Sequence, residues 1–218
     1  MTTIDFEEAR ERMVAEQLEA RGFDAAAVLA AIRRVPRHLF VDPSLQERAY
    51  DDTPLPIGER QTISQPYMVA LMTEALEVRP GARVLEVGTG SGYQAAVLAE
   101  MGAHVVTLER IPALGHRARE VLAVLGYADR VTVSVSDGTL GAPAGAPYDG
   151  IIVTAGAPRI PRPLVEQLAP GACLVLPMGD DDVQTLVRIR RGAEGLSEEY
   201  LGECRFVKLF GSYGWEEP

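Results

Sequence analysis

The chain has 218 residues, 47% of them hydrophobic, and its 31 acidic and 21 basic side chains give a net charge of −10. These values predict a globular protein with enough apolar residues for one sizeable core. No block of basic residues offsets the acidic excess. The composition therefore argues against binding to nucleic acid, because proteins bind its phosphates with basic side chains.

The two cysteines, Cys173 and Cys204, stand far apart and have no partners at metal-ligand spacing. We therefore expect reduced thiols in a cytoplasmic protein, and no metal site. Residues 1–8 are acidic and lack the apolar segment of a signal peptide, and no apolar run is long enough to cross a membrane. The expectation is a monomer without membrane contacts.

The first part of the chain predicts three helices, at 5–21, 25–34 and 43–49. Asp5 and Asp24 stand where they can cap the first two, and Glu8 completes a capping-box pattern with Asp5. Gly22 ends the first helix, and Pro36 stops the second. We expect these helices to form an amino-terminal layer beside the main sheet.

Residues 50–65 are different, because two prolines and a glycine rule out a regular helix. Leu55, Ile57 and Ile63 are nevertheless too apolar for a bare solvent loop. A long irregular loop inside a compact domain is usually functional, so this segment is a candidate for part of the site.

A helix over 66–77 should follow, with Pro66 at its first position. Ser64 and Gln65 would then lie at its amino terminus, where free N–H groups and the helix dipole favour an anion. A simple helix cap is the alternative role for Ser64.

Residues 84–100 predict a buried strand, a glycine turn and a helix start. The glycines of the turn are Gly88, Gly90 and Gly92, which let the backbone approach a ligand closely. Tyr93 stands where a dinucleotide fold needs its last glycine. The acid Glu86 precedes the first glycine by two positions, and this spacing resembles motif I of the class I S-adenosyl-L-methionine (AdoMet) methyltransferases. A purely structural tight turn is the alternative.

The rest of the chain alternates strands and helices. Strands are predicted at 103–108, 131–135, 148–154, 172–176, 184–190 and 200–209, and helices at 112–125 and 161–168. The pattern predicts an α/β fold with a doubly wound, mostly parallel, Rossmann-like sheet and an antiparallel pair of strands at its carboxyl-terminal end. We expect one domain over 1–218, in which 1–65 supply the helical extension and a substrate loop and 66–218 form the AdoMet-binding core.

Two acids follow neighbouring strands of this predicted sheet. Glu109 stands 19 residues beyond Gly90, where α/β nucleotide folds place a carboxylate for ribose hydroxyls. Asp137 and Gly138 follow the next strand, and an acid there can accept a hydrogen bond from an adenine amino group. An exposed charge is the alternative for Glu109, and a plain Asp-Gly turn is the alternative for Asp137.

Nearly the whole chain resembles the protein-L-isoaspartate O-methyltransferases. The family's motifs stand at 35–41 (Val-Pro-Arg-His-Leu-Phe-Val), 49–50, 54–58, 61–68, 85–94, 109–112, 137–138, 151–154 and 157–158. The glycine turn indicates only an AdoMet enzyme, whereas Thr-Ile-Ser-Gln-Pro at 62–66 is much more specific.

The resemblance implies methyl transfer from AdoMet to the free α-carboxylate of L-isoaspartyl residues in damaged proteins. The methyl ester then collapses to a succinimide, and S-adenosyl-L-homocysteine is the other product. The residues implied are Ser64 in catalysis; Gln65, Glu86, Gly88, Gly90, Gly92, Glu109, Arg110, Asp137 and Gly138 in cofactor binding; and Ile57, Thr62, Ile63 and Val207 in substrate binding.

The implied chemistry suits these residues. A carboxylate is already ionised at neutral pH and needs no general base to attack the sulfonium cation of AdoMet. Ser64 is therefore expected to orient the carboxylate and not to act as a nucleophile. His38 is the rival for acid/base work, but a core or capping role fits it better.

Three residues depart from the family pattern: Arg60 replaces a small residue, Ser136 a glycine and Lys208 a proline. Arg60 could crowd its loop or attract anionic substrates. Two other functions stay open, namely methylation of a small-molecule carboxylate and a non-catalytic binding module on the same fold.

Overall fold

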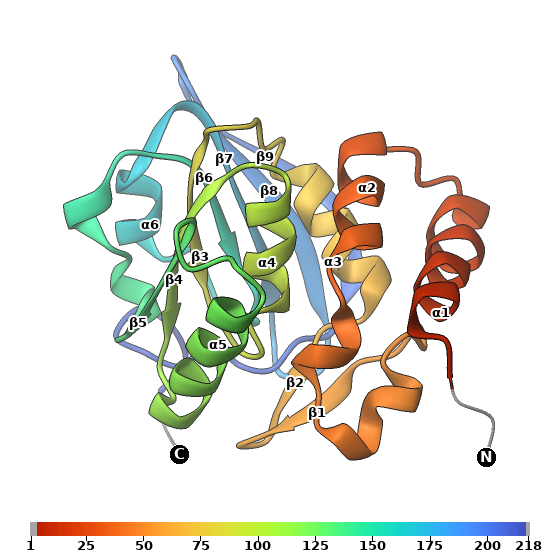
Figure 1. Cartoon of the computed structure of the whole chain (residues 1–218). Helices are drawn as coiled ribbons and strands as arrows, with labels where there is room; N and C mark the ends of the chain where they lie inside the picture. The colour runs from red at the N-terminus through yellow and green to blue at the C-terminus, as the bar shows by residue number, and fades with distance from the viewer. Residues whose placement is uncertain (1–3, 217–218) are drawn as a thin grey trace.

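The computed structural model describes residues 4–216, so the first three residues of the acidic amino terminus lie outside it. A seven-stranded sheet in the order β5-β4-β3-β6-β7-β8-β9 forms its centre (Figure 1). The strands are β3 (Arg83–Val87), β4 (His104–Glu109), β5 (Val131–Val135), β6 (Tyr148–Val153), β7 (Leu168–Gly179), β8 (Gln184–Gly192) and β9 (Gly195–Cys204). The first five are parallel, and β8 and β9 are antiparallel to their neighbours, which confirms the predicted fold class.

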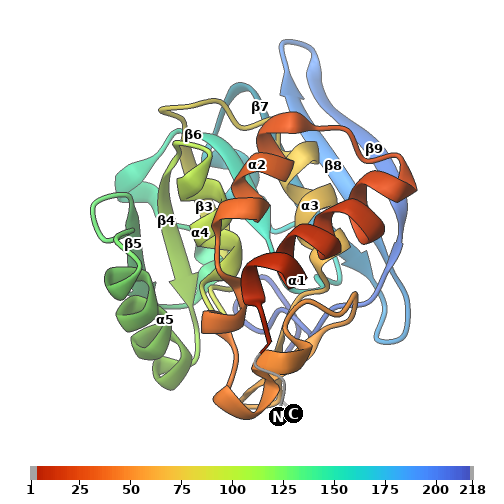
Figure 2. The same ribbon diagram turned by 45° about the vertical axis from the view of Figure 1, so that its right-hand side comes forward.

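Successive side chains of the strands point to opposite faces of the sheet and contribute to two hydrophobic clusters, one on each face. The helices are α1 (Phe6–Met13), α2 (Ala26–Arg34), α3 (Pro66–Ala75), α4 (Tyr93–Glu100), α5 (Pro112–Val124) and α6 (Arg162–Glu166). Val84 and Ile152 pack with residues of α1 to α5, which cover one face in Figure 2. Leu85 and Ile151 pack on the other face with Leu164 of α6. The sheet is thus wound on both sides, but its helices gather mainly on one.

The amino-terminal helix forms over the predicted residues but changes its winding. After α1 the chain continues as a π-helix, η1 (Val14–Leu18), and a 3-10 helix, η2 (Glu19–Arg21). The Asp5 carboxylate accepts hydrogen bonds from the N–H groups of Glu7 and Glu8 at 3.0 and 3.1 Å, as its capping position predicts. Gly22 ends the helix in a left-handed conformation with φ 82°.

Two other helix predictions need correction. The prediction that Asp24 caps α2 is wrong, because Ala25 occupies the N-cap position and no side chain caps it. The segment predicted as a helix over 43–49 is a 3-10 helix, η4 (Pro43–Arg48), in which the Asp42 carboxylate accepts from the Ser44 N–H at 2.9 Å.

The segment 50–65 is not irregular, because it contains the hairpin of β1 (Leu55–Gly58) and β2 (Gln61–Ile63). Leu55 pairs with Ile63 across the hairpin, and both side chains are buried. The side chains of β1 alternate between the two faces of the strand: Leu55 and Ile57 are buried, while Pro56 faces solvent. The prolines therefore prevent a helix but are compatible with an extended strand.

The last strand also lies earlier than predicted, at 195–204 instead of 200–209. The chain then leaves the sheet. Val207 and Leu209, which made this segment look like part of the last strand, do not pair with β8. Both make main-chain hydrogen bonds to Gly156, beyond the carboxyl end of β6.

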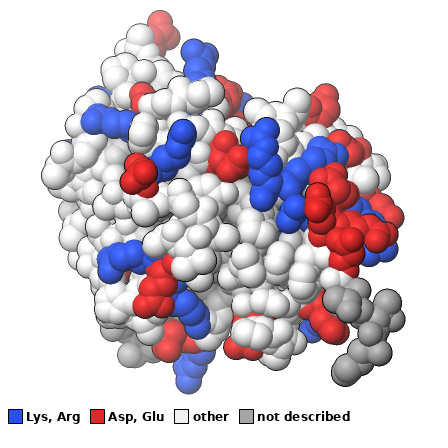
Figure 3. Space-filling view, in the orientation of Figure 1, with Lys and Arg blue, Asp and Glu red and all other residues white. Residues whose placement is uncertain are grey.

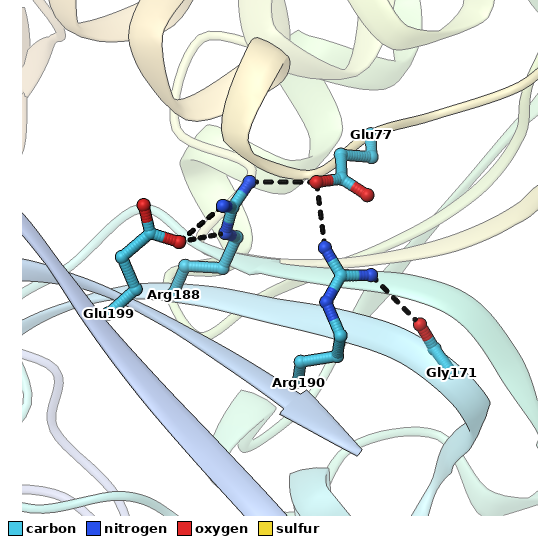
Figure 4. Close-up of polar contacts among 5 residues, drawn as sticks. All are labelled: Glu77, Gly171, Arg188, Arg190 and Glu199. Carbon is cyan, nitrogen blue, oxygen red and sulfur yellow. Dashed lines mark hydrogen bonds and ion pairs between the residues drawn. The ribbon is translucent and has the colours of Figure 1, made fainter. Parts of the chain in front are cut away.

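An ion-pair network joins the end of α3 to the outer strands (Figure 4). Oε1 of Glu77 accepts from Arg188 Nη1 at 2.8 Å and from Arg190 Nη2 at 2.7 Å. Arg188 also pairs with Glu199 of β9, and Arg190 donates to the Gly171 carbonyl. Because Glu77 is half exposed, this network fixes geometry more than it adds stability.

Charged side chains of both signs are interspersed on the face drawn in Figure 3, with a dense group over the amino-terminal helices. Arg33 pairs there with Glu11 at 3.0 Å and with Glu19 at 2.9 Å. On this face, acidic side chains are therefore partly neutralised by neighbouring basic ones. The basic side chains do not form a single patch.

The hairpin turn offers a stability test. Glu59 and Arg60 form its two-residue loop with φ 52° and 57°, a left-handed conformation that disfavours side chains with a Cβ atom. We expect Arg60→Gly to raise the free energy of unfolding by about 0.5–1 kcal/mol, since relief of strain exceeds the extra entropy of an unfolded glycine. Chemical denaturation measures this change. Arg60→Ala removes the same charge but keeps Cβ, so an equal gain in that variant would contradict a backbone origin.

Candidate active site

A cavity lies beyond the carboxyl ends of β3, β4 and β6, where open α/β sheets bind ligands. Its walls come from the β1–β2 hairpin, the glycine turn, the end of β4, residues 154–155 and residues 207–210. These walls surround about 830 Å³ of space, part of it open to solvent.

The cavity brings together nine of the residues predicted for the site: Thr62, Ile63, Ser64, Gly88, Gly90, Glu109, Arg110, Gly138 and Val207. Five predicted residues do not line it: Ile57, Gln65, Glu86, Gly92 and Asp137. Sequence reasoning missed several lining residues, among them Gln94, Thr154 and Lys208. Thr154 could have been found, because it directly follows the carboxyl end of the parallel strand β6.

The glycine turn has two separate tasks. A Cβ atom on Gly88 would lie 2.5 Å from Oγ1 of Thr154, so only glycine lets the turn pack this closely against Thr154. Gly90 donates its N–H to the Glu109 carboxylate at 2.8 Å. Gly92 instead faces α5, where an added Cβ would crowd Ala118 at 3.3 Å. The third glycine therefore fits α4 against α5 and acts on the cavity only through this packing.

Glu86 is the most unusual ionisable group of the structure. Its side chain has 0% exposure, and neither carboxylate oxygen has a hydrogen-bond partner among the described residues. Burial raises its pKa to about 8, the nearby charge of Glu109 adds to the rise, and the Thr107 hydroxyl opposes it. A buried carboxyl without a partner, two residues before the glycine turn, is a candidate counter-charge for a cationic group, and it lies behind the cavity wall.

Glu109 is held differently, although it is also buried. Its two oxygens accept hydrogen bonds from the N–H groups of Gly90 at 2.8 Å and Ile111 at 2.9 Å. Each carboxylate oxygen can accept a second hydrogen bond, so the side chain can still bind hydroxyl groups that enter the cavity. This geometry fits the predicted contact with a ribose.

Asp137 is largely engaged by the protein itself. Its Oδ1 accepts from the Thr139 N–H at 2.9 Å and hydroxyl at 2.6 Å, and its Oδ2 accepts from the Ser212 N–H at 2.8 Å. Partial burial opposes the effect, but these bonds hold its pKa below the usual value. Asp137 thus stabilises the turn that places Gly138 at the cavity, and a direct adenine contact stays a prediction.

Ser64 lies half-buried in the cavity wall, immediately before α3. Gln65 is the N-cap residue of α3, and no side chain caps this helix. Within residues 4–216 the Ser64 hydroxyl makes no hydrogen bond, whereas its carbonyl accepts from Arg37 Nη2 at 2.7 Å. The hydroxyl is therefore available to a ligand, which the alternative role of a helix cap would not allow.

The segment 207–210 crosses the cavity as an extended chain. Gly156 binds it on both sides, because its N–H donates to the Val207 carbonyl at 2.7 Å and its carbonyl accepts from the Leu209 N–H at 2.9 Å. The main-chain N–H and carbonyl of Lys208 have no partner among the described residues. The Lys208 ammonium group contacts Asp181 at 2.6 Å and lies 4.9 Å from the Trp215 ring centroid.

His38 lies away from the cavity. Its ring stacks on Phe6 with centroids 4.1 Å apart, and its Nδ1 lies 2.8 Å from the Tyr50 hydroxyl. Burial lowers its pKa. These contacts agree with the core role expected for this histidine.

The described part of the chain also lacks two other kinds of feature. Residues 4–216 hold no cluster of three histidine, cysteine or acidic side chains suited to a metal ion. None of their helices has the length and apolar character needed to span a bilayer.

Glu86→Gln tests the burial of an uncompensated carboxyl. Its pKa of about 8 exceeds the usual value in an unfolded chain, so wild-type stability is lost as the pH rises from about 5 to above 8. We expect Glu86→Gln to raise the free energy of unfolding by at least about 1 kcal/mol at pH 8.5, with little gain at pH 5. Urea denaturation at pH 5 and at pH 8.5 measures this difference. An equal gain in stability at the two pH values would refute the raised pKa of Glu86.

Comparisons with known proteins agree with this geometry. The family model described as protein-L-isoaspartate(D-aspartate) O-methyltransferase matches residues 8–214. Protein-L-isoaspartate O-methyltransferase 1 of Syntrophobacter fumaroxidans is 55% identical over 213 residues, which cover 98% of this chain and 99% of the relative. The Methanoculleus marisnigri enzyme of the same name is 54% identical over 207 residues, or 95% of this chain and 94% of its own.

Solved structures extend the comparison to three dimensions. A protein-L-isoaspartate O-methyltransferase structure matches with a TM-score of 0.83 and 29% identity, covering 94% of this chain and 67% of that one. A Plasmodium falciparum structure, described as such an enzyme in complex with S-adenosyl-L-homocysteine, matches with a TM-score of 0.81 and 26% identity, covering 95% of this chain and 99% of its own. The chain belongs to the protein-L-isoaspartate(D-aspartate) O-methyltransferase family.

Proposed function

We propose that this protein transfers the methyl group of AdoMet to the free α-carboxylate of L-isoaspartyl residues in damaged proteins and peptides. The methyl ester then collapses to a succinimide, which hydrolysis can return in part to normal aspartate. The observation that carries the proposal is the meeting of Ser64 and the glycine turn at one cavity, with the partnerless Glu86 two residues before Gly88. Family membership and the names of the relatives support the same reaction.

The residues present fit AdoMet as the cofactor. Glu86 supplies a counter-charge for the cationic amino group from behind the turn, and the glycine at 88 lets the turn pack closely against Thr154 of the cavity wall. Glu109 has acceptor capacity for ribose hydroxyls. AdoMet supplies the methyl group from its sulfonium centre. The residues assigned to the cofactor are Gln65, Glu86, Gly88, Gly90, Gly92, Glu109, Arg110, Asp137 and Gly138, of which Gln65, Glu86, Gly92 and Asp137 act from behind the cavity wall.

The acceptor peptide is assigned to the opposite side of the cavity. The Ser64 hydroxyl donates a hydrogen bond to the attacking carboxylate and sets its direction. The unpaired main-chain N–H and carbonyl of Lys208 can bind an extended peptide backbone without reading its side chains. Such recognition suits a repair enzyme, because damaged residues occur in many sequence contexts. The residues assigned to the substrate are Ile57, Thr62, Ile63 and Val207, with Ile57 acting through the buried face of the hairpin.

The reaction needs positioning more than acid–base chemistry. An isoaspartyl carboxylate is ionised at neutral pH, so no residue has to remove a proton from it. Charge is cancelled as the anion attacks the cation, and a pocket that excludes water therefore favours the transfer. The hairpin and the segment 207–210 flank the cavity and can limit the access of water.

The substrate partners are damaged proteins and peptides, and we assign their repair to the cytoplasm. The two described cysteines are free thiols, which suits a reducing compartment. A small-molecule carboxylate is the second candidate for the acceptor. Such an acceptor has no peptide backbone that could bind the unpaired main-chain N–H and carbonyl of Lys208.

Methyl transfer to matched peptides tests the proposal. Two synthetic peptides would be identical except that one carries L-isoaspartate and the other L-aspartate. We expect label from methyl-labelled AdoMet to enter the isoaspartyl peptide alone, as a base-labile ester. Small dicarboxylic acids serve as competing acceptors.

Three outcomes would count against the proposal. Methylation of the small acids without the peptide would support the small-molecule enzyme. Binding of AdoMet without transfer to any acceptor would support a binding module. Equal labelling of both peptides would mean that the pocket does not select the isoaspartyl linkage.

A further inference from the structure

Arg37 belongs to the Val-Pro-Arg-His-Leu-Phe-Val motif and has no place in the proposed reaction so far. Its side chain has 0% exposure and lies behind the wall of the cavity. The guanidinium donates from Nε to the Ala49 carbonyl at 2.8 Å and from Nη2 to the Ser64 carbonyl at 2.7 Å. A single rigid group therefore holds the main chain on both sides of the hairpin segment, once before it and once at Ser64.

The guanidinium is buried without a counter-charge. Within residues 4–216 it forms no ion pair, and its Nη1 has no hydrogen-bond partner. Asp52 exerts a weak attraction but is itself paired with Arg21 at 2.5 Å. Burial lowers the pKa of Arg37 to about 10, so the group still carries its charge at neutral pH.

An unpaired buried charge disfavours folding, and a neutral side chain could support two carbonyls at lower cost. A fold that keeps such a group has a use for its geometry or its charge. Arg37 also lies 4.9 Å from the ring centroid of Tyr93, which lines the cavity, and Phe40 packs edge-on against the same ring. The guanidinium is thus fixed on two sides, by carbonyl groups and by an aromatic wall.

We propose that Arg37 is a positioning residue for methyl transfer, which holds the Ser64 main chain so that its hydroxyl meets the acceptor carboxylate in line with the methyl group. This inference rests on the proposed role of Ser64. The planar fork of arginine can bond two carbonyls at fixed angles, whereas the ammonium group of lysine is a point donor on a flexible stem. The positive charge also lies on the acceptor's side of the cavity, where it favours an ionised carboxylate.

A double-mutant cycle tests the proposal on the full chain with an L-isoaspartyl peptide as acceptor. The variants are Arg37→Lys, Arg37→Gln, Ser64→Ala and each Arg37 change combined with Ser64→Ala. We expect Ser64→Ala to lower kcat by about 10- to 100-fold and Arg37→Lys by about 10-fold, while the Kd of AdoMet changes less than about twofold. In the Ser64→Ala background, Arg37→Lys should lower kcat less than about twofold further, since its effect acts through the missing hydroxyl.

The matched control is Arg191→Lys. Arg191 also donates to two main-chain carbonyls, those of Glu166 and Leu168, but it does not line the cavity. We expect it to leave kcat unchanged.

Three results would overturn the proposal: the same loss of kcat from Arg37→Lys with and without Ser64, a loss of AdoMet affinity that parallels the loss of kcat, or failure of both Arg37 variants to fold. Turnover of the isoaspartyl peptide by the wild-type protein is measured in the same series. The proposed function therefore stands or falls separately from the role of Arg37.

Discussion

The burial of Glu86 constrains the rest of the site. This carboxyl sits on β3 in the middle of the sheet, paired in register with Thr107 of β4 and Ile152 of β6, where water cannot solvate it. The strand delivers it to the start of the glycine turn, and none of the described residues neutralises it. With a pKa near 8, the carboxyl of the ligand-free fold is mostly protonated at pH 7, and on the proposed assignment a bound cation would favour its ionised form. The glycine at 88, the anchored Glu109 and the open carboxyl end of the sheet are arranged around that position.

On the proposed assignments, the protein also buries an ionisable group of the opposite kind. Arg37 lies behind Ser64, as Glu86 lies before Gly88, and both groups are fully buried. The two reactants are themselves opposite in charge, a sulfonium cation and a carboxylate. Arg37 keeps its charge on the side assigned to the carboxylate, and Glu86 would ionise when the cationic amino group of AdoMet binds. No general base is needed, because the acceptor carboxylate is already ionised at neutral pH.

The sheet and the glycine turn were predictable because buried strands and tight turns leave local signals in sequence: apolar runs, glycines and strand-terminal acids. The hairpin at 55–63 was predicted only as an irregular loop, since two prolines and a glycine ruled out a helix, whereas the alternate burial of Leu55 and Ile57 decided the strand. Val207 was predicted for the site and lines the cavity, but the pairing of 207–210 with Gly156 was not predicted, because Gly156 is distant in sequence. Asp137 shows the same limit at a predicted site residue: its spacing matched a ligand role, but only the fold reveals that Ser212 and Thr139 occupy its oxygens.

The most direct test of this account is the protonation state of Glu86, read by infrared difference spectroscopy with and without S-adenosyl-L-homocysteine at pH 7. We expect the free protein to show the carbonyl band of a protonated, buried carboxylic acid, since the pKa lies near 8. Binding of the product, which keeps the cationic amino group, should convert this band to that of a carboxylate, and Glu86→Gln should abolish the change. Two results would contradict the central role of Glu86 as a buried carboxyl without a partner: an ionised Glu86 in the free protein, or a Glu86 that stays protonated in the complex.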